Sequence, residues 1–232
     1  MRSPAPAPTR IFLLSPARCD GVRMMMLRRK AAQFALALEL RSEMGATLGD
    51  VFTFTSGLYF RGKLTYARSF GPSWVITPGA GLVEPERRIR PRDLDAWAKV
   101  RVDLDDRRYR HPLERDARAL AERLPDAEVV LLGSIASDKY VDLLLDIFEH
   151  RLLFPVDFVG RGDMSRGGLL LRSARAGAEL PYGPVRGAVR HGPRPPRLPK
   201  LPRAAAGTTR SSQPRLGRSS RLPDRRGCVA GS

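Results

Sequence analysis

The sequence is poor in cysteine, histidine and long apolar runs. Its two cysteines, Cys19 and Cys228, stand near opposite ends of the 232-residue chain, and neither has His or Cys neighbours at metal-ligand spacing. We therefore expect no structural disulfide and no zinc site, and a reducing cytoplasm is the simplest compartment. No apolar run approaches the roughly 18 residues of a membrane span. Residues 11–14 are too short an apolar run for the core of a signal peptide.

Several catalytic classes lack their usual signature. The three histidines, His111, His150 and His191, have no partner at catalytic or metal spacing, which disfavours a serine- or cysteine-nucleophile hydrolase and a metalloenzyme. The phosphate-binding pattern GxxxxGK[ST] and the dinucleotide pattern GxGxxG are both absent, which disfavours a nucleoside triphosphatase and a Rossmann dehydrogenase. We predict neither a cofactor nor a metal.

The positive charge is concentrated at the carboxyl end. The whole chain carries a net charge of +17, of which residues 183–232 contribute twelve basic and one acidic residue. This segment holds many prolines and almost no large apolar side chains, so we predict a disordered Arg/Pro-rich tail over 183–232. It is either a basic arm for nucleic acid or an acidic partner, or an incidental extension. Residues 1–10 are proline-rich and are also predicted to be disordered.

The remaining residues, 11–182, form one predicted α/β domain. Short apolar or β-prone runs predict strands, and apolar residues at helical spacing predict helices between them. This order is typical of a single mixed or mostly parallel sheet flanked by helices. The predicted strands are 11–14, 51–55, 74–77, 128–133 and 152–154. The predicted helices are 24–41, one that begins near Thr55 or Ser56, one that runs to Leu124, 141–150 and 167–177.

Polar residues follow three of these strands. Open α/β sheets bind ligands at the carboxyl ends of their strands, so these residues are the first candidates for ligand contacts. They are Ser15 and Arg18, then Ser56, Tyr59, Arg61 and Lys63, and finally Gly133, Ser134 and Lys139. For the segment from Ser15 to Gly21, a plain Asp-Gly turn with surface charges is an equally good interpretation.

A second candidate site is the glycine-rich stretch 160–168. Arg161, Asp163, Ser165 and Arg166 lie within six residues, interspersed with four glycines. Glycine lets a backbone turn sharply and approach a ligand, while guanidinium and carboxylate groups make directional contacts. We therefore predict a polar loop in which Asp163 and Ser165 are the candidate catalytic residues and Arg161 and Arg166 bind a ligand.

Several pieces, in this order, resemble the YaaA-type peroxide-stress and DNA-binding family and domains of deazaguanine nucleic-acid-modification enzymes. The pieces are Leu14-Ser-Pro-Ala-Arg18, Phe54-Thr-Ser-Gly-Leu-Tyr-Phe-Arg-Gly-Lys-Leu-Thr-Tyr-Ala-Arg68, Thr77-Pro-Gly-Ala-Gly-Leu-Val83 with Ile89-Arg-Pro-Arg-Asp93, and Val130-Leu-Leu-Gly133 with Lys139-Tyr140. The resemblance implies a bacterial α/β domain with its site at the strand ends, associated with nucleic acid or modified bases. Thr77-Pro-Gly-Ala80 stands where the family has Ser-Ala-Lys-Tyr, and Arg92 where it has tyrosine, which removes two polar groups from a base-recognition site.

Three hypotheses remain open. In the first, the protein binds DNA, RNA or a nucleotide and is linked to base modification or DNA stress, with the basic residues on phosphates or base edges and Tyr59 stacking on a base. In the second, it is an enzyme on a small nucleoside-like or glycosyl substrate, with Asp163 as acid/base. In the third, 160–168 is a structural turn in which Arg161 or Arg166 pairs with Asp163. The sequence indicates no membrane partner and no oligomeric state.

Overall fold

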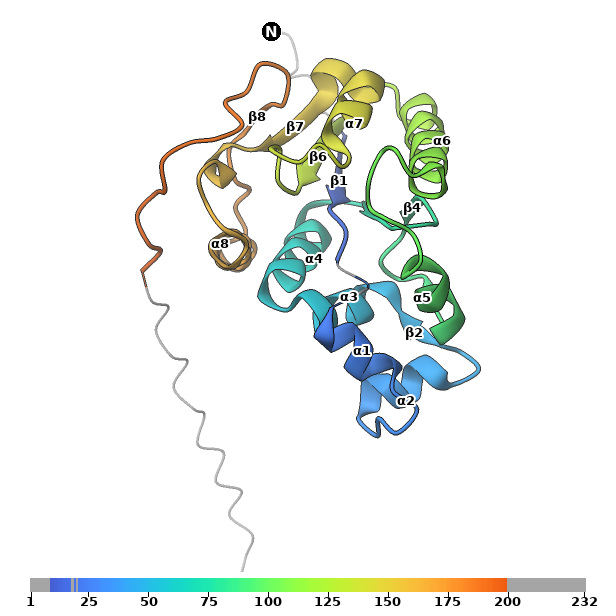
Figure 1. Ribbon diagram of the computed structural model, residues 1–232. Helices are drawn as coiled ribbons and strands as arrows, with labels where there is room; N and C mark the ends of the chain where they lie inside the picture. Colours follow the sequence, from blue (N-terminus) through green and yellow to red (C-terminus); the bar gives the residue numbers. More distant parts are fainter. Residues whose placement is uncertain (1–8, 18, 20, 200–232) are drawn as a thin grey trace, which may run out of the picture. The chain divides into compact units, whose positions relative to one another are not determined.

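The structure is a computed structural model that describes residues 9–17, 19 and 21–199 (Figure 1). The expectations for residues 1–8, Arg18 and residues 200–232, which include Cys228, lie outside these residues. Among the helices of the described residues, none combines the length and the apolar character that a membrane crossing requires.

The described residues contain a six-stranded sheet with the order β4-β3-β1-β6-β7-β8. Its four inner strands are parallel, and the edge strands β4 and β8 are antiparallel to their neighbours. A separate antiparallel pair joins β2 and β5. The strands are β1 (Arg10–Leu14), β2 (Ala46–Thr47), β3 (Ser73–Ile76), β4 (Leu82–Val83), β5 (Arg88–Ile89), β6 (Glu128–Leu132), β7 (Leu152–Pro155) and β8 (Tyr182–Pro184). The predicted mixed, mostly parallel sheet is therefore confirmed.

Helices cover both faces of this sheet. They are α1 (Val22–Arg28), α2 (Ala35–Arg41), α3 (Leu48–Ser56), α4 (Leu58–Phe70), α5 (Pro91–Trp97), α6 (Arg107–Arg123), α7 (Val141–Phe148) and α8 (Asp163–Ala176), with two 3-10 turns, η1 (Glu149–Arg151) and η2 (Val156–Phe158). In Figure 1 α4 and α8 lie on the opposite side of the sheet from α6 and α7.

The wholly apolar strand β1 explains this layering. Successive side chains of a strand point to opposite faces, so a strand with a helix layer on each side is apolar throughout. Phe12 and Leu14 belong to the core under α4 and α8, whereas Ile11 and Leu13 belong to the core under α6 and α7. All four side chains are fully buried.

The helix predicted over residues 24–41 is interrupted. The chain forms α1 and α2 instead, and the segment between them is held by the guanidinium group of Arg41, which donates to the carbonyl oxygens of Arg29 and Ala32. The break lets the Phe34 ring stack on Phe54, with 5.1 Å between the ring centroids. The apolar spacing within 24–41 could not indicate this break, because the break depends on the polar side chain of Arg41 and on Phe54, which lies outside the segment.

The strand predicted over residues 51–55 is wrong, because this segment is part of α3. Thr47 caps the helix, since its hydroxyl oxygen accepts from the backbone N–H of Asp50 at 3.2 Å. Leu48, Val51 and Phe52 are fully buried on one helical face. Burial of that face outweighs the β propensity of a Val-Phe-Thr-Phe-Thr run.

The domain continues past the boundary predicted at residue 182. The strand β8 crosses that boundary, and Val185 is buried and donates its backbone N–H to Leu152 O at 2.9 Å. The compact unit extends to Leu198. The start of the tail was therefore placed too early, because β8 has a Tyr-Gly-Pro sequence that shows no strand periodicity.

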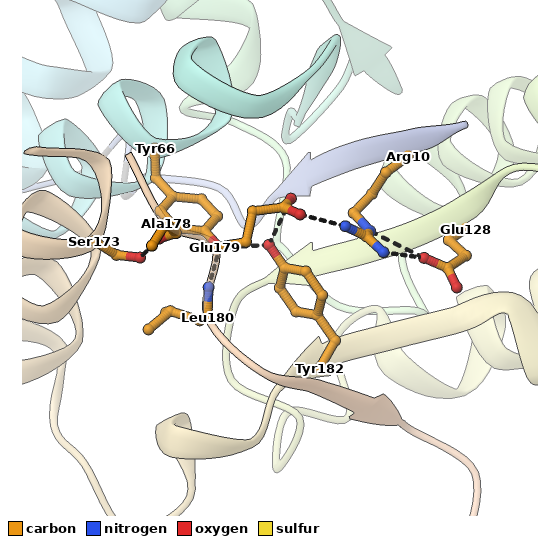
Figure 2. Close-up of polar contacts among 8 residues, drawn as sticks. All are labelled: Arg10, Tyr66, Glu128, Ser173, Ala178, Glu179, Leu180 and Tyr182. Carbon is orange, nitrogen blue, oxygen red and sulfur yellow. Dashed lines mark hydrogen bonds and ion pairs between the residues drawn. The ribbon is translucent and has the colours of Figure 1, made fainter. Parts of the chain in front are cut away.

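A polar network ties the segment between α8 and β8 to the rest of the domain. Figure 2 shows the guanidinium group of Arg10 between the carboxylates of Glu128 and Glu179. The hydroxyl of Tyr66 accepts from the backbone N–H of Leu180 at 2.8 Å and is hydrogen-bonded to the hydroxyl of Tyr182. The network thus connects β1, β6, α4 and the chain that leads into β8.

Substitution of Tyr66 by Phe tests the importance of this network for stability. The change leaves the buried N–H of Leu180 without its acceptor, which should lower the free energy of unfolding by about 1–3 kcal/mol. Tyr109→Phe is the matched control, because the buried Tyr109 hydroxyl has no hydrogen-bond partner among the described residues. Urea denaturation should show this control unchanged or slightly stabilised, and equal losses in both variants would contradict the prediction.

Candidate functional site

A cavity of about 710 Å³ opens at the carboxyl ends of β1 and β6. Ser15 follows β1 and Ser134 follows β6, and both line it. The chain leaves β1 toward β3 on one side and later returns to β6 on the other side of β1. Such a reversal of strand order opens a crevice between the two connections, and it is the usual ligand-binding position of an open α/β sheet.

The cavity wall combines hydroxyl groups, cations, two tyrosines and one carboxylate. Arg23 comes from α1, Tyr59 from α4, and Lys139 and Tyr140 from the segment before α7, while Asp163 is the first residue of α8. The hydroxyl-bearing residues in the wall, besides the two tyrosines, are Ser15, Thr55, Ser56, Ser134 and Ser137. Six residues predicted from the sequence are thus brought together here: Ser15, Ser56, Tyr59, Ser134, Lys139 and Asp163.

Lys63 lies behind this wall, fully buried in α4. Its Nζ is 2.7 Å from the carbonyl oxygen and 2.9 Å from the hydroxyl oxygen of Ser15, so it contacts the cavity through Ser15. The rings of Tyr59 and Phe60 lie 4.5 and 5.0 Å from Nζ. No carboxylate in the part of the chain that the structure describes forms an ion pair with Lys63.

Burial lowers the pKa of Lys63 to about 7, because the ammonium group has lost its hydration. The carboxylate of Asp163 acts in the opposite direction, and the guanidinium group of Arg166 adds to the lowering. Burial also raises the pKa of Tyr59 and of Tyr140 above the ordinary tyrosine value. Ionisable groups with shifted pKa values in a cleft are typical of functional sites.

Gly133 lets Ser15 and Tyr140 lie close together. A Cβ at position 133 would be 2.8 Å from Ser15 Cβ and 2.9 Å from the Tyr140 hydroxyl oxygen, so only glycine fits between them. The Tyr140 hydroxyl donates to Ser134 O at 3.2 Å. Gly133, which was predicted to contact a ligand, is packed between Ser15 and Tyr140 in the structure.

The contact between α4 and α8 brings Asp163 and Arg166 to this site. The two helices cross backbone to backbone: a Cβ at Gly62 would be 2.6 Å from Gly167 O, and one at Gly167 would be 2.7 Å from Leu58 O. The stretch predicted as a glycine-rich loop is therefore largely the start of α8. Gly167 serves the approach of two helices, which a sequence cannot distinguish from the approach of a ligand.

Besides Lys63 and Gly133, four predicted site residues lie outside the cavity wall: Arg61, Arg161, Ser165 and Arg166. Arg161 donates to Asp157 O at 2.9 Å and to the Ser165 hydroxyl at 3.3 Å, and Arg166 donates to Phe158 O at 3.1 Å. Both arginines thus hold η2 against the start of α8. Arg166 also lies 3.7 Å from the Asp163 carboxylate, as the structural-turn hypothesis expected. Arg61 is exposed on α4.

Sequence reasoning missed Arg23, Thr55, Ser137 and the ring of Tyr140 as parts of the wall. Arg23 lies just before the helix predicted over 24–41 and Thr55 at the end of the strand predicted over 51–55, so the direction of their side chains could not be inferred. Tyr140 directly follows Lys139, which was predicted as a ligand contact. An aromatic residue next to a predicted cation was the only feature of the sequence that could have indicated Tyr140. The described residues contain no group of three or more His, Cys, Asp or Glu that could hold a metal ion.

Comparison with known proteins adds no relative: no family model, no curated protein and no solved structure matches this chain.

A pair of glycine substitutions tests the crossing of α4 and α8. Gly167→Ala places a methyl group against the backbone of α4, and we expect a loss of stability of about 1–3 kcal/mol. Gly168→Ala is the matched control, because its nearest contact would be Leu198 Cδ1 at 3.6 Å. Alanine is the better helix former by about 1 kcal/mol, so this control should be neutral or stabilising. Thermal unfolding distinguishes them, and tolerance of Gly167→Ala would contradict the close crossing.

The burial of Lys63 predicts that stability rises with pH. The unfolded chain keeps its proton on Lys63 up to the ordinary value of 10.5, whereas the folded protein loses it near 7. The destabilisation is therefore complete below pH 7 and is relieved as the pH rises from 7 toward 10, by about 1.4 kcal/mol per pH unit. Urea denaturation from pH 6 to 9 should show this slope in the wild type.

The slope should disappear in Lys63→Met, which removes the titrating amine. Lys30→Met, at an exposed lysine, should keep it. A difference in the free energy of unfolding that is the same at every pH reports only lost packing or hydrogen bonds in Lys63→Met. The quantity to compare is therefore the slope of the free energy of unfolding against pH. Parallel curves for the wild type and Lys63→Met would contradict a lowered pKa.

Proposed function

We propose that this protein binds a nucleotide-like small molecule in the cavity between the ends of β1 and β6. One observation carries the proposal: the cavity lies where the strand order reverses, and hydroxyl groups and two cations converge on it. Its volume is in the range of pockets that enclose a small molecule.

Each class of side chain in the wall has a matching group on such a ligand. The exposed cations Arg23 and Lys139 suit a phosphate or another anionic group. The hydroxyls of Ser56 and Ser134 can donate to and accept from a sugar or a base edge. The ring of Tyr59 is only 7% exposed, so it offers an aromatic edge to the cavity and is not free to stack broadly on a base.

A mononucleotide-sized ligand fits better than a long nucleic acid contacted over a flat basic surface. Many arginines of the described residues are paired with carboxylates, as in Arg28–Asp95, Arg88–Glu39 and Arg118–Glu114. Paired guanidinium groups offer less net positive charge to a phosphate backbone. The resemblance to the YaaA-type family supports a ligand related to nucleic acids or modified bases, and the end of a single strand is the form of nucleic acid that the cavity suits.

The second candidate function is an enzyme that acts on a small nucleoside-like or glycosyl substrate with Asp163 as acid/base. The observation in its favour is that Asp163 lines the same cavity, with a side chain that is 70% exposed. A carboxylate in that position would contact a bound molecule. This candidate function assigns no catalytic role to Ser165, because the hydroxyl of Ser165 accepts a hydrogen bond from Arg161.

Binding of AMP and of a single-stranded oligonucleotide to the full chain, measured by calorimetry across a salt titration, tests the proposal. Removal of one cation that pairs with the ligand phosphate should weaken AMP binding by about tenfold, since a charge-assisted hydrogen bond contributes about 1.5 kcal/mol or more. We expect this loss in Lys139→Ala and no change in Lys30→Ala, whose lysine is equally exposed but away from the cavity wall. If the Lys139→Ala variant bound the oligonucleotide as tightly as the wild type, and AMP did not bind at all, the proposal would be contradicted.

A further inference from the structure

Ser15 and Lys63 form a hydroxyl–amine pair that the proposed ligand site does not use. Ser15 directly follows β1, and its backbone N–H donates to Leu132 O at 3.2 Å, which continues the β1–β6 pairing beyond the strand. This bond fixes the backbone of Ser15, and Ser15 is one of the residues that line the cavity. Ser15 therefore stands on a rigid element at the wall of a ligand-sized space.

Lys63 is held against that hydroxyl from the opposite side. The stem of Lys63 comes from α4, and the aromatic rings of Tyr59 and Phe60 enclose its amine. The residue is 1% exposed, so its amine is almost completely removed from bulk solvent in the free protein. Its two hydrogen-bond partners in the described chain both belong to Ser15.

Lys63 Nζ donates to the carbonyl and hydroxyl oxygens of Ser15, and in a neutral amine the contact with the hydroxyl can run in the opposite direction. A neutral lysine amine has two N–H donors and one lone pair. One N–H satisfies the carbonyl oxygen of Ser15 at 2.7 Å, and the lone pair can then accept the hydroxyl proton of Ser15 across 2.9 Å. The pKa of about 7 means that a large fraction of the protein has this neutral form at physiological pH.

A serine hydroxyl can be activated by a lysine in place of a histidine. A hydroxyl becomes a nucleophile when a base within hydrogen-bond reach accepts its proton as it attacks. Lysine serves as that base when burial keeps its amine neutral. The charged groups that act on Lys63 are Asp163 and Arg166, both on α8, and on its own helix the ring of Tyr59 lies 4.5 Å from Nζ.

The geometry points to Ser15 as a nucleophile and Lys63 as its general base, in a site that hydrolyses a carboxylic ester whose alcohol portion carries an anionic group. The choice of substrate rests on the proposed function, because Arg23 and Lys139 in the cavity wall would hold that anionic group. The assignment of the pair itself rests only on the contacts between Ser15 and Lys63.

Two steps complete the reaction. In the first, Ser15 Oγ bonds to the ester carbonyl carbon as Lys63 takes the hydroxyl proton. The carbonyl re-forms as the bond to the alcohol oxygen breaks, and the Lys63 ammonium protonates that oxygen. In the second, water gives a proton to Lys63 and attacks the acyl carbon, and Ser15 leaves with the proton returned from Lys63. One ester and one water become one acid and one alcohol, so no oxidant or metal is consumed.

Labelling of the full chain with a fluorophosphonate probe tests the pair. The reagent phosphonylates an activated serine and releases fluoride, and mass spectrometry identifies the modified residue. We expect modification at Ser15 and a labelling rate that rises about tenfold between pH 6 and 8, as Lys63 loses its proton. Ser15→Ala should abolish the label, and Lys63→Met should slow it at least 100-fold.

The matched controls are Ser69→Ala and Lys30→Met, both at exposed positions outside the cavity wall, and both should label as the wild type does. Thermal unfolding verifies that each variant is folded. If Lys63→Met does not fold, the pH dependence of labelling in the wild type tests whether Lys63 acts as the base. An unlabelled Ser15, or a rate that is flat from pH 6 to 9, would overturn the assignment.

Hydrolysis assays separate this inference from the proposed ligand. An AMP acetylated on its ribose and 4-nitrophenyl acetate are compared, and we expect the nucleotide ester to be the better substrate by at least tenfold in kcat/KM, with that preference lost in Lys139→Ala. Labelling of Ser15 under the control of Lys63 supports the pair even where AMP does not bind. Equal use of both esters in a protein that labels at Ser15 would overturn the substrate class.

Discussion

The arrangement of the site depends on the close crossing of α4 and α8 at Gly62 and Gly167. Without side chains at these positions, the helix backbones approach closely enough to enclose the residue next to Gly62, which is Lys63. The same crossing brings the first residue of α8, Asp163, to the cavity wall, and Arg166 close enough to influence the amine. The burial of Lys63 and the position of the Asp163 carboxylate at the cavity wall thus both depend on this contact between two helices.

A buried lysine without a described ion-pair partner is costly in a chain that pairs its other cations so widely. The domain satisfies Arg10 with Glu128 and Glu179 and satisfies Arg41 with backbone carbonyl oxygens. Among residues 9–17, 19 and 21–199, Lys63 instead has as hydrogen-bond partners only a carbonyl and a hydroxyl oxygen of one serine. Sites that depart from the general pattern of a structure at an energetic cost are often functional, because stability alone does not favour them.

The parallel part of the sheet was predictable because its strands are buried on both faces. Residues 11–14, 74–77, 128–133 and 152–154 were recognised as strands from short apolar runs, and these are the four parallel strands β1, β3, β6 and β7. The strand predicted over residues 51–55 failed because an alternating run that contains two phenylalanines fits a buried helical face equally well. The helix break after α1 depends on Arg41, whose polar side chain binds the chain between α1 and α2, and on Phe54, which lies outside the segment.

The candidate site could be predicted only in part. Ser15, Tyr59, Ser134 and Lys139 were found because each follows a strand or begins a helix, and the ends of neighbouring parallel strands lie at the same edge of a sheet. The stretch 160–168 was interpreted as a ligand loop, since glycines that allow a helix crossing look the same in a sequence as glycines that allow a ligand to approach. Arg161 and Arg166 were selected for their charge, but they bind backbone carbonyl oxygens.

The sequence by itself determined the α/β class, the parallel core strands and the edge of the sheet at which polar residues collect, because these follow from local periodicity and from the residues after each strand. Only the tertiary structure decided that Lys63 contacts Ser15, which is 48 residues away in the chain. The reason is physical: the contact and the lowered pKa arise from burial and from the packing of α4 against α8, and neither is a property of any single segment.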